Sequence, residues 1–232
     1  MKYYIIAGEP SGDLHGSNLM KGIVKADPEA EFRFWGGDMM AEVGGKENLV
    51  KHYRAMSFFG FVQVACNLRT IFRQIADVKR DIESAIRSGE VGSFLSIRTR
   101  EEALRLQKMS VEESRLGIPL IFGYDIIHGC RVIFPENLAM SCSWNLASVE
   151  RAARVAAEES AAMGIHWTFS PMCDISVDPR WSRVSEGAGE DPYLGAKIAA
   201  ATVRGYQGDD LSSDKTIAAC VKHFAAYGAA QA

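Results

Sequence analysis

The chain has 232 residues, of which 47% are hydrophobic and 24% are charged, and its formal net charge is -3. Such a chain can bury one large core or two modest ones, and without an excess of basic residues it is not expected to bind nucleic acid. No apolar run approaches the roughly 20 residues that span a bilayer, so we expect no transmembrane segment.

The N-terminus and the cysteines bear on the compartment. The opening MKYYIIAGEP reaches Gly8 and Glu9 before a secretory signal could form its apolar segment, so we expect no signal peptide and a cytoplasmic protein. The five cysteines are scattered without a CxxC pair, and the five histidines show no HxxxH or HExxH spacing. These patterns favour neither a disulfide framework nor a zinc site, and we expect no metal and no other cofactor.

The first elements in the chain are a strand, a tight turn and a helix. Residues 2–7 are a β-rich apolar run, GEPSGD follows, and residues 14–25 carry apolar side chains at helical spacing. Ser11 or Asp13 is expected to cap this helix. A second strand is expected at residues 31–35, followed by a GGD turn and a short helix. The alternation of strand and helix indicates a parallel α/β layer.

The GEPSGD turn is a candidate ligand site. Unpaired N–H groups at a helix start attract anions, so the turn could cradle an anion or a sugar phosphate. Glu9 would then act as an acid, a base or a hydroxyl ligand, with Ser11, Gly12 and Asp13 beside it. Alternatively, the glycines only permit the tight turn, and Ser11 and Asp13 only cap the helix. Both interpretations stay open.

A long amphipathic helix is expected next. Apolar residues recur at a spacing of three and four over residues 68–89, without a Gly/Pro/Ser-rich linker. Four short apolar segments follow, separated by helical patterns, and they read as consecutive βα units. These segments are residues 91–96, 119–124, 165–172 and 216–221.

Helix boundaries in this second part are well marked. Thr99 and Glu102 have the spacing of a capping box, and Asp191 followed by Pro192 is typical of a helix start. An Ala/Glu/Arg-rich helix over residues 146–163 is expected to stop at Gly164.

Polar residues follow the predicted strands directly. Asp125 ends one strand, Lys222 and His223 end another, and Arg183 lies in the DPRWSR loop after the third. Parallel barrels build their active sites at these strand ends. A carboxylate, a guanidinium, an ammonium and an imidazole together suit a sugar, because vicinal hydroxyls need donors and acceptors. Alternatively, Asp125 caps a loop and the arginines of the loop pair with carboxylates such as Glu186.

The motifs VGSFL, LQKMSVEESRLGIPLIFGYDIIHG, DPRWSR, EGAGEDPYLG and KHFAAYG make residues 84–232 resemble the N-terminal barrel of glycoside hydrolase family 3, the bacterial β-glucosidases. The resemblance implies that Asp125, Arg183, Lys222 and His223 hold the terminal glucose, and that the KHF stretch carries non-proline cis peptides. It also implies retaining hydrolysis of terminal β-D-glucosides. Ser182 departs from the family's usual glycine, which could alter the loop that aims Arg183.

Retaining glycosidases need two carboxylates about 5 Å apart. By the resemblance, the family's nucleophile and its acid/base lie beyond the last motif, so both are expected to lie past the end of this sequence. We therefore expect no catalytic residue and no hydrolysis from these residues alone.

The motifs AGEPSGDLHGSNLM, FRFWGGDMM and LVKHYRAMSFFGFVQV make residues 1–82 resemble the start of lipid-A-disaccharide synthase, a glycosyltransferase. The resemblance implies that Glu9, Ser11, Gly12 and Asp13 line an acceptor cleft. Residues 56–61, MSFFGF, would contact acyl chains or a membrane surface, or else form a plain core segment. Transferase activity is also not expected, because the sugar-nucleotide lobe is missing.

The sequence thus predicts a chimera with two domains, residues 1–82 and 83–232. Its predicted fold class is α/β, with a Rossmann/flavodoxin-like N-terminal fragment joined by a long helix to a partial TIM (β/α) barrel. The expected function is that of a truncated β-glucosidase that binds glucose or a β-glucoside. The alternatives are a lipid-A-disaccharide synthase fragment and a non-catalytic or engineered fusion. Open edges of a four-stranded barrel fragment predict self-association.

Overall fold

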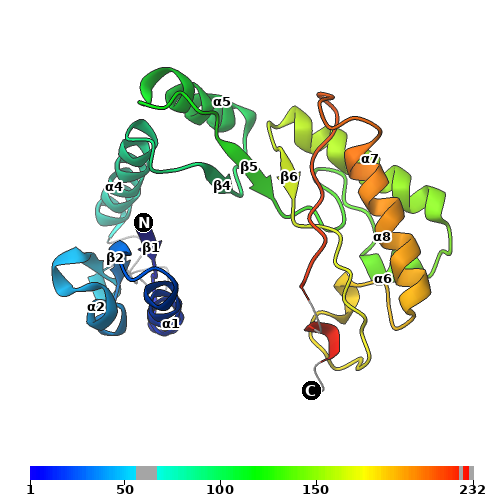
Figure 1. The fold of residues 1–232 in the computed structure, drawn as a ribbon, viewed down its shortest axis with the longest axis horizontal. Coiled ribbons are helices and arrows are strands. Elements are labelled where there is room, and N and C mark those ends of the chain that lie inside the picture. The colour runs from blue at the N-terminus through cyan, green and yellow to red at the C-terminus, as the bar shows by residue number, and fades with distance from the viewer. Residues whose placement is uncertain (56–66, 225–226, 230–232) are drawn as a thin grey trace. The chain divides into compact units, whose positions relative to one another are not determined.

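The structure is a computed structural model that describes residues 1–55, 67–224 and 227–229. It divides into two compact units, Met1–Ser84 and Ala85–Ala232, and the boundary falls within helix α4, Leu68–Arg87 (Figure 1). The MSFFGF segment lies outside the described residues. Within the described part of the chain, no helix combines the length and apolar character needed to cross a bilayer.

The first unit contains a three-stranded parallel sheet in the order β1-β2-β3. Its elements are β1 Lys2–Ile6, α1 Pro10–Ala26, β2 Glu31–Gly36, α2 Asp38–Gly44 and β3 Leu49–His52. Met20, Phe34 and Met40 are fully buried at the centre of its core. The two predicted strands and their helices are confirmed. The sequence reasoning missed β3, because four residues with only two apolar side chains show no readable alternation.

The predicted cap of α1 is wrong. Glu9 occupies the N-cap position, Pro10 begins the helix, and no side chain caps it. Asp13 is buried, and its carboxylate accepts hydrogen bonds at 2.7 to 3.1 Å from three backbone N–H groups where α2 begins, those of Gly37, Met39 and Met40. Since a buried carboxylate needs such partners, Asp13 ties α1 to α2 instead of capping its own helix.

The second unit contains a parallel sheet in the order β4-β5-β6, with helices between and after its strands. Its elements are β4 Ser93–Leu95, α5 Arg100–Lys108, β5 Ile121–Tyr124, α6 Asn137–Ser141, α7 Leu146–Ala162, β6 Trp167–Thr168 and α8 Pro192–Gln207. The fourth predicted segment runs beside β6 through parallel bridges of Ala218 with Trp167 and of Lys222 with Met172. All four segments therefore lie parallel and in chain order. Pro171 has no N–H to donate, which limits the ladder here.

The predicted helix boundaries are confirmed. The Thr99 hydroxyl accepts a hydrogen bond from the Glu102 N–H at 3.2 Å, at the start of α5. The Asp191 carboxylate accepts one from the Leu194 N–H at 2.7 Å, at the start of α8. Gly164 follows α7 with a φ of 86°, a left-handed conformation that stops the helix.

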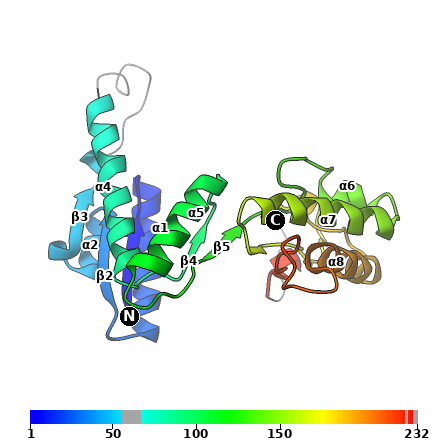
Figure 2. The ribbon, with the colours of Figure 1, turned by 90° about the horizontal axis from the view of Figure 1, so that it is seen from above.

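Helices α7 and α8 pack side by side (Figure 2). Ile126, Ala157, Tyr206 and Ile217 are buried in the cluster between them and the strand ends. The Tyr206 hydroxyl donates a hydrogen bond to the Ile126 carbonyl at 2.7 Å. Burial raises the pKa of Tyr206 to about 12, so the phenol remains a donor at neutral pH. The core thereby fixes the backbone next to Asp125.

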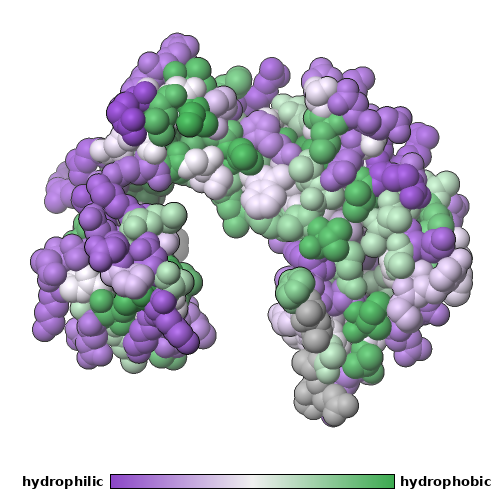
Figure 3. Space-filling model, viewed as in Figure 1, coloured by the Kyte–Doolittle hydropathy of each residue, from purple (hydrophilic) through white to green (hydrophobic). Residues whose placement is uncertain are grey.

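One face of the sheet, that of Ile121 and Leu95, is apolar and largely uncovered within the described part of the chain. Phe122 is almost fully buried, whereas Ile121 beside it on β5 is 53% exposed. The register pairs Leu95 of β4 with Gly123 of β5, on the same face as Ile121, and Leu95 is 60% exposed. Figure 3 shows green, hydrophobic side chains at the surface over α5, β4 and β5. Such exposure is unusual, because parallel sheets are normally covered on both faces.

Candidate functional site

A cleft of about 590 Å³ lies at the C-terminal end of β5. Its lining includes three acidic or amide side chains and an ion pair, namely Asp125, Glu136, Asn137, Arg183 and Glu186. Clefts of several hundred Å³ are large enough for a small organic ligand. The size and the polar lining make this the candidate site.

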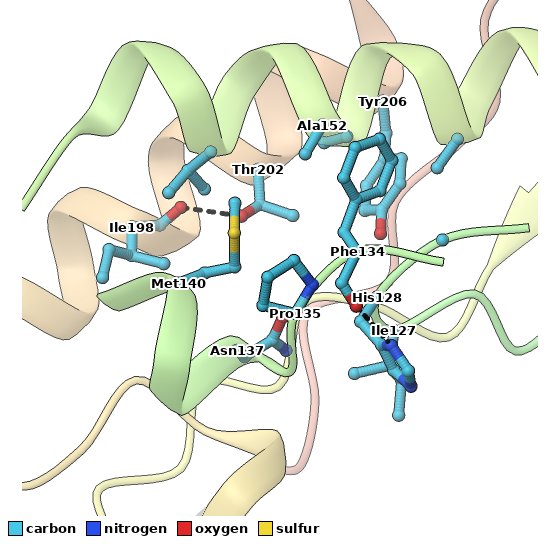
Figure 4. A pocket seen from close by; sticks show the side chains of 14 residues that line it. Ile127, His128, Phe134, Pro135, Asn137, Met140, Ala152, Ile198, Thr202 and Tyr206 are labelled. Carbon is cyan, nitrogen blue, oxygen red and sulfur yellow. Dashed lines mark hydrogen bonds between the residues drawn. The ribbon is translucent and has the colours of Figure 1, made fainter. Parts of the chain in front are cut away.

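A second cavity is a packing defect of the core. It measures about 30 Å³ and lies between α6, α7, α8 and the loop before α6 (Figure 4). Its lining is mostly apolar, and the Thr202 hydroxyl beside it already donates to the Ile198 carbonyl at 2.9 Å. This volume suits one water molecule and excludes a sugar.

The structure brings Asp125 and Lys222 together. Asp125 directly follows β5, and Lys222 ends the bridged segment beside β6. The Lys222 ammonium lies 3.4 Å from the Asp125 carboxylate, where the lysine side chain is 13% exposed and the aspartate side chain 51% exposed. The carboxylate thus keeps one side open to the cleft while its other side neutralises a mostly buried ammonium.

Arg183 and His223 form the second contact. The Arg183 terminal nitrogen Nη1 lies 3.2 Å from His223 Nε2. Arg183 comes directly before the short 3-10 turn Val184–Glu186, and the Lys222–His223 peptide bond is cis, as the resemblance implied for this stretch. Because Lys222 and His223 are consecutive, the four predicted residues lie in one neighbourhood.

Glu186 is a contact that the sequence reasoning offered only as an alternative. It binds Arg183 through two parallel bonds, with Arg183 Nε donating to Oε1 at 2.7 Å. This bidentate pair holds the pKa of Glu186 below its ordinary value and raises the pKa of Arg183. Arg183 both pairs with Glu186 and lines the cleft. The ion pair therefore does not exclude Arg183 from the candidate site.

Asp174 is a contact that the sequence reasoning did not assign. Its side chain is 2% exposed, and Oδ2 lies 2.9 Å from His223 Nδ1 and accepts a hydrogen bond from the His223 backbone N–H at 3.1 Å. The available signal was its position, because Asp174 follows the third apolar segment as Asp125 follows the second.

Acidification should loosen the Arg183–Glu186 pair. The folded pKa of Glu186 lies below its ordinary 4.5, so the pair stabilises the fold above that pH and this contribution is lost as the pH falls through the lowered value. Glu186→Gln should remove this part of the acid sensitivity. Urea midpoints measured between pH 7 and 3 test it, and an unchanged pH profile in the variant would contradict it.

The four candidate residues of the GEPSGD turn do not share one environment. Glu9 and Ser11 are exposed and hydrogen-bonded to each other at 2.5 Å. Gly12 packs closely on Ala7, since a Cβ at Gly12 would lie 3.2 Å from that of Ala7. The Asp13 carboxylate is occupied by backbone donors. Among the described residues, no group of three His, Cys, Asp or Glu could hold a metal ion.

Known proteins match the two parts of the chain differently. Residues 61–232 match the glycosyl hydrolase family 3 N-terminal domain, and residues 3–88 match lipid-A-disaccharide synthetase. A periplasmic beta-glucosidase of Salmonella typhimurium is 42% identical over 153 residues, covering 66% of this chain and 20% of the relative. A lysosomal beta glucosidase of Dictyostelium discoideum is 37% identical, covering 53% of this chain and 16% of the relative.

Solved structures agree with these matches. A beta-glucosidase from Listeria innocua in complex with glucose has a TM-score of 0.57 and 46% identity, covering 60% of this chain and 20% of that one. The same enzyme carrying the D270A substitution, in complex with laminaribiose, has a TM-score of 0.59. The chain therefore spans about one fifth of the length of these relatives.

The predicted cytoplasmic location is contradicted. The relatives include the periplasmic beta-glucosidase of Salmonella typhimurium and a periplasmic beta-glucosidase/beta-xylosidase of Dickeya chrysanthemi. The prediction used the first ten residues, which lie in the part that matches lipid-A-disaccharide synthetase, so they carry no information on where the other part works. By the match over residues 61–232, the chain belongs to the glycosyl hydrolase family 3 N-terminal domain family.

Proposed function

We propose that residues 83–232 bind the terminal glucose of a β-glucoside through Asp125, Arg183, Lys222 and His223. The observation that carries the proposal is the convergence of two contacts at neighbouring strand ends, Lys222 with Asp125 at 3.4 Å and Arg183 with His223 at 3.2 Å. The Listeria innocua enzyme, similar over this part, is known in complex with glucose.

The chemistry of the four side chains supports a neutral polyhydroxylated ligand. An ammonium carries three N–H donors, and Lys222 uses one on Asp125, which leaves two for hydroxyl oxygens. The half-exposed Asp125 carboxylate has acceptor sites left for hydroxyl protons. Because each positive group already has a negative partner, an anionic ligand would gain less here than a sugar.

We propose that these residues bind the sugar and do not cleave its bond. The three carboxylates of this contact network are engaged, Asp125 by Lys222, Glu186 by Arg183 and Asp174 by His223. Retaining hydrolysis of β-D-glucosides, proposed for the whole family protein, would then need two further carboxylates from a chain that carries the rest of the barrel. Mixing the protein with such a chain should restore aryl-glucoside hydrolysis.

We also propose a finer fold assignment for each part of the chain. Residues 1–82 would be a Rossmann/flavodoxin-like fragment and residues 83–232 a partial TIM (β/α) barrel, with α4 running between them. The parallel order β1-β2-β3 with its helices supports the first assignment. Polar residues at the C-terminal ends of parallel strands support the second.

A second candidate function is that of a glycosyltransferase fragment. The match of residues 3–88 to lipid-A-disaccharide synthetase favours it, and the hydrogen-bonded Glu9 and Ser11 lie exposed after β1. Turnover of a UDP-sugar would support this function. A third candidate is a fusion without catalysis, for which neither aryl-glucoside hydrolysis nor UDP-sugar turnover would be detected.

Calorimetric titration tests the main proposal. We expect saturable heat with glucose and methyl β-D-glucoside, and weaker heat with methyl α-D-glucoside and with glucose 1-phosphate. The phosphate ester tests the preference for a neutral ligand. Equal binding of all four compounds, or of none, would contradict the proposed site.

We also propose that the uncovered sheet face drives self-association. Burial of Leu95 and Ile121, which are 60% and 53% exposed, would contribute about 25 cal/mol per Å² of apolar surface. Sedimentation should show assemblies larger than a monomer that grow with concentration, and Leu95→Lys with Ile121→Lys should abolish them. The control is Leu104→Lys, a 58% exposed position on α5. A wild-type monomer at all concentrations would refute the idea.

A further inference from the structure

Asp174 is buried next to His223 and does not line the cleft of the candidate site. We propose that Asp174 is a positioning residue, which fixes the proton of His223 and through it the direction of the Arg183 guanidinium. This inference rests on the proposed sugar binding for its purpose, although the arrangement of the proton can be measured without any sugar.

The two neighbours of His223 require one tautomer. A carboxylate can only accept at neutral pH, so the contact of Asp174 Oδ2 with Nδ1 at 2.9 Å requires a proton on Nδ1. A guanidinium can only donate, so the contact of Arg183 with Nε2 at 3.2 Å requires a lone pair on Nε2. Both demands are met by the neutral imidazole that carries its proton on Nδ1.

The same Asp174 oxygen holds the backbone of His223. Oδ2 accepts the His223 N–H at 3.1 Å in addition to the ring contact, so it fixes the residue at two points. The ring therefore cannot turn without breaking a bond to a carboxylate that is 2% exposed. A buried charged acceptor that loses its donor is strongly unfavourable, which makes the arrangement rigid.

The fixed His223 ring in turn restrains the Arg183 guanidinium. A guanidinium has five N–H donors in a fixed plane. Arg183 uses two on Glu186 and one on His223, and a hydrogen bond with Tyr227 also contributes to its raised pKa, so at most one of the five remains for a ligand. The two terminal nitrogens are held from both sides, by Glu186 and by His223. The N–H group left for a ligand then points in a fixed direction, as recognition of a specific hydroxyl requires.

Tyr227 and Gly228 cover this chain of contacts. The Tyr227 ring lies edge to face on His223, with 4.8 Å between ring centroids, and under the Arg183 guanidinium at 5.5 Å. Gly228 packs on the segment that carries Asp174, since a Cβ there would lie 2.3 Å from the Ile175 carbonyl oxygen. The cover limits the access of water to the Asp174–His223 bond, which strengthens it.

Nuclear magnetic resonance of protein with ¹⁵N-labelled histidine tests the proton arrangement directly. Spectra at about pH 8, above the usual imidazole titration, distinguish Nδ1–H from Nε2–H in a neutral ring. The His223 signals are identified by their loss in His223→Gln. We expect the Nδ1–H form in the wild type and a shift toward Nε2–H in Asp174→Ala. An Nε2–H ring in the wild type, or no change in Asp174→Ala, would overturn the inference.

Glucose titration then tests whether the position of the His223 proton affects glucose affinity. Asp174→Ala should weaken glucose binding about 10-fold, the effect of losing one charged hydrogen bond. Asp178→Ala is the matched control, because Asp178 lies in the same loop with a side chain that is only 11% exposed, but it binds Arg180. Equal weakening in both variants would overturn the positioning role as a loop effect. A wild type with the expected tautomer and no glucose binding would refute the proposed function alone.

Discussion

Replacing Asp125 by alanine is expected to reduce glucose binding below detection in a titration that resolves a 100-fold loss. The carboxylate is half exposed toward the cleft and is the acceptor nearest to the Lys222 ammonium at 3.4 Å. Hydrogen bonds to charged groups contribute about 1.5 to 3 kcal/mol each, so the loss of one or two of them to a sugar weakens binding 10- to 100-fold or more. The variant also leaves a mostly buried ammonium without its partner.

Two variants show whether the Asp125 effect is specific. Asp125→Asn keeps the size and one acceptor oxygen, so its affinity should fall between those of the wild type and Asp125→Ala. Glu158→Ala removes an exposed carboxylate on α7 that does not line the cleft, and binding should change less than threefold, because a charge outside the cleft acts through screened solvent. Identical glucose titrations of the wild type and Asp125→Ala would contradict the proposed binding of glucose at this site.

Gly205→Ala is expected to give the largest loss of stability, about 2 to 3 kcal/mol. Gly205 lies on α8 and packs directly against α7. A Cβ added there would lie 2.5 Å from the Ala153 Cβ and 2.5 Å from the Glu150 carbonyl oxygen. Alanine normally favours a helix over glycine by about 1 kcal/mol, but here the clash involves backbone that cannot move without separating the helices.

The control is the same substitution at the other end of α8. A Cβ at Gly195 would lie 3.4 Å from the Ile175 Cδ1, an ordinary contact, so Gly195→Ala should stabilise by about 0.5 to 1 kcal/mol. Urea unfolding followed by fluorescence in a Trp35→Phe background reports the second unit, because the other tryptophans lie there. The prediction fails if Gly205→Ala unfolds at the wild-type urea concentration.

The sequence predicted what local patterns and strand ends determine. Asp125, Lys222 and His223 could be found because each follows an apolar segment directly, and strand ends meet at one edge of a parallel sheet. Helix starts at Thr99 and Asp191 could be found because a capping side chain acts three residues away.

The sequence could not show contacts between distant positions. Asp174 and His223 are 49 residues apart, and Asp13 and Gly37 are 24 residues apart. No spacing rule connects such pairs, so a buried carboxylate was read as a cap or left unassigned. The bounds of the short strands could not be predicted for the same reason, since β6 has only two residues and is defined by its pairing with β5.

The Tyr206 phenol has a consequence for anyone who screens random variants. It holds the Ile126 carbonyl from 80 positions downstream, and Ile126 is the next residue after Asp125. A change at Tyr206 would therefore disturb the sugar contact without touching the sugar. A mutational scan scored on ligand capture alone would group this core tyrosine with the true contact residues, and only a parallel scan of protein abundance would separate them.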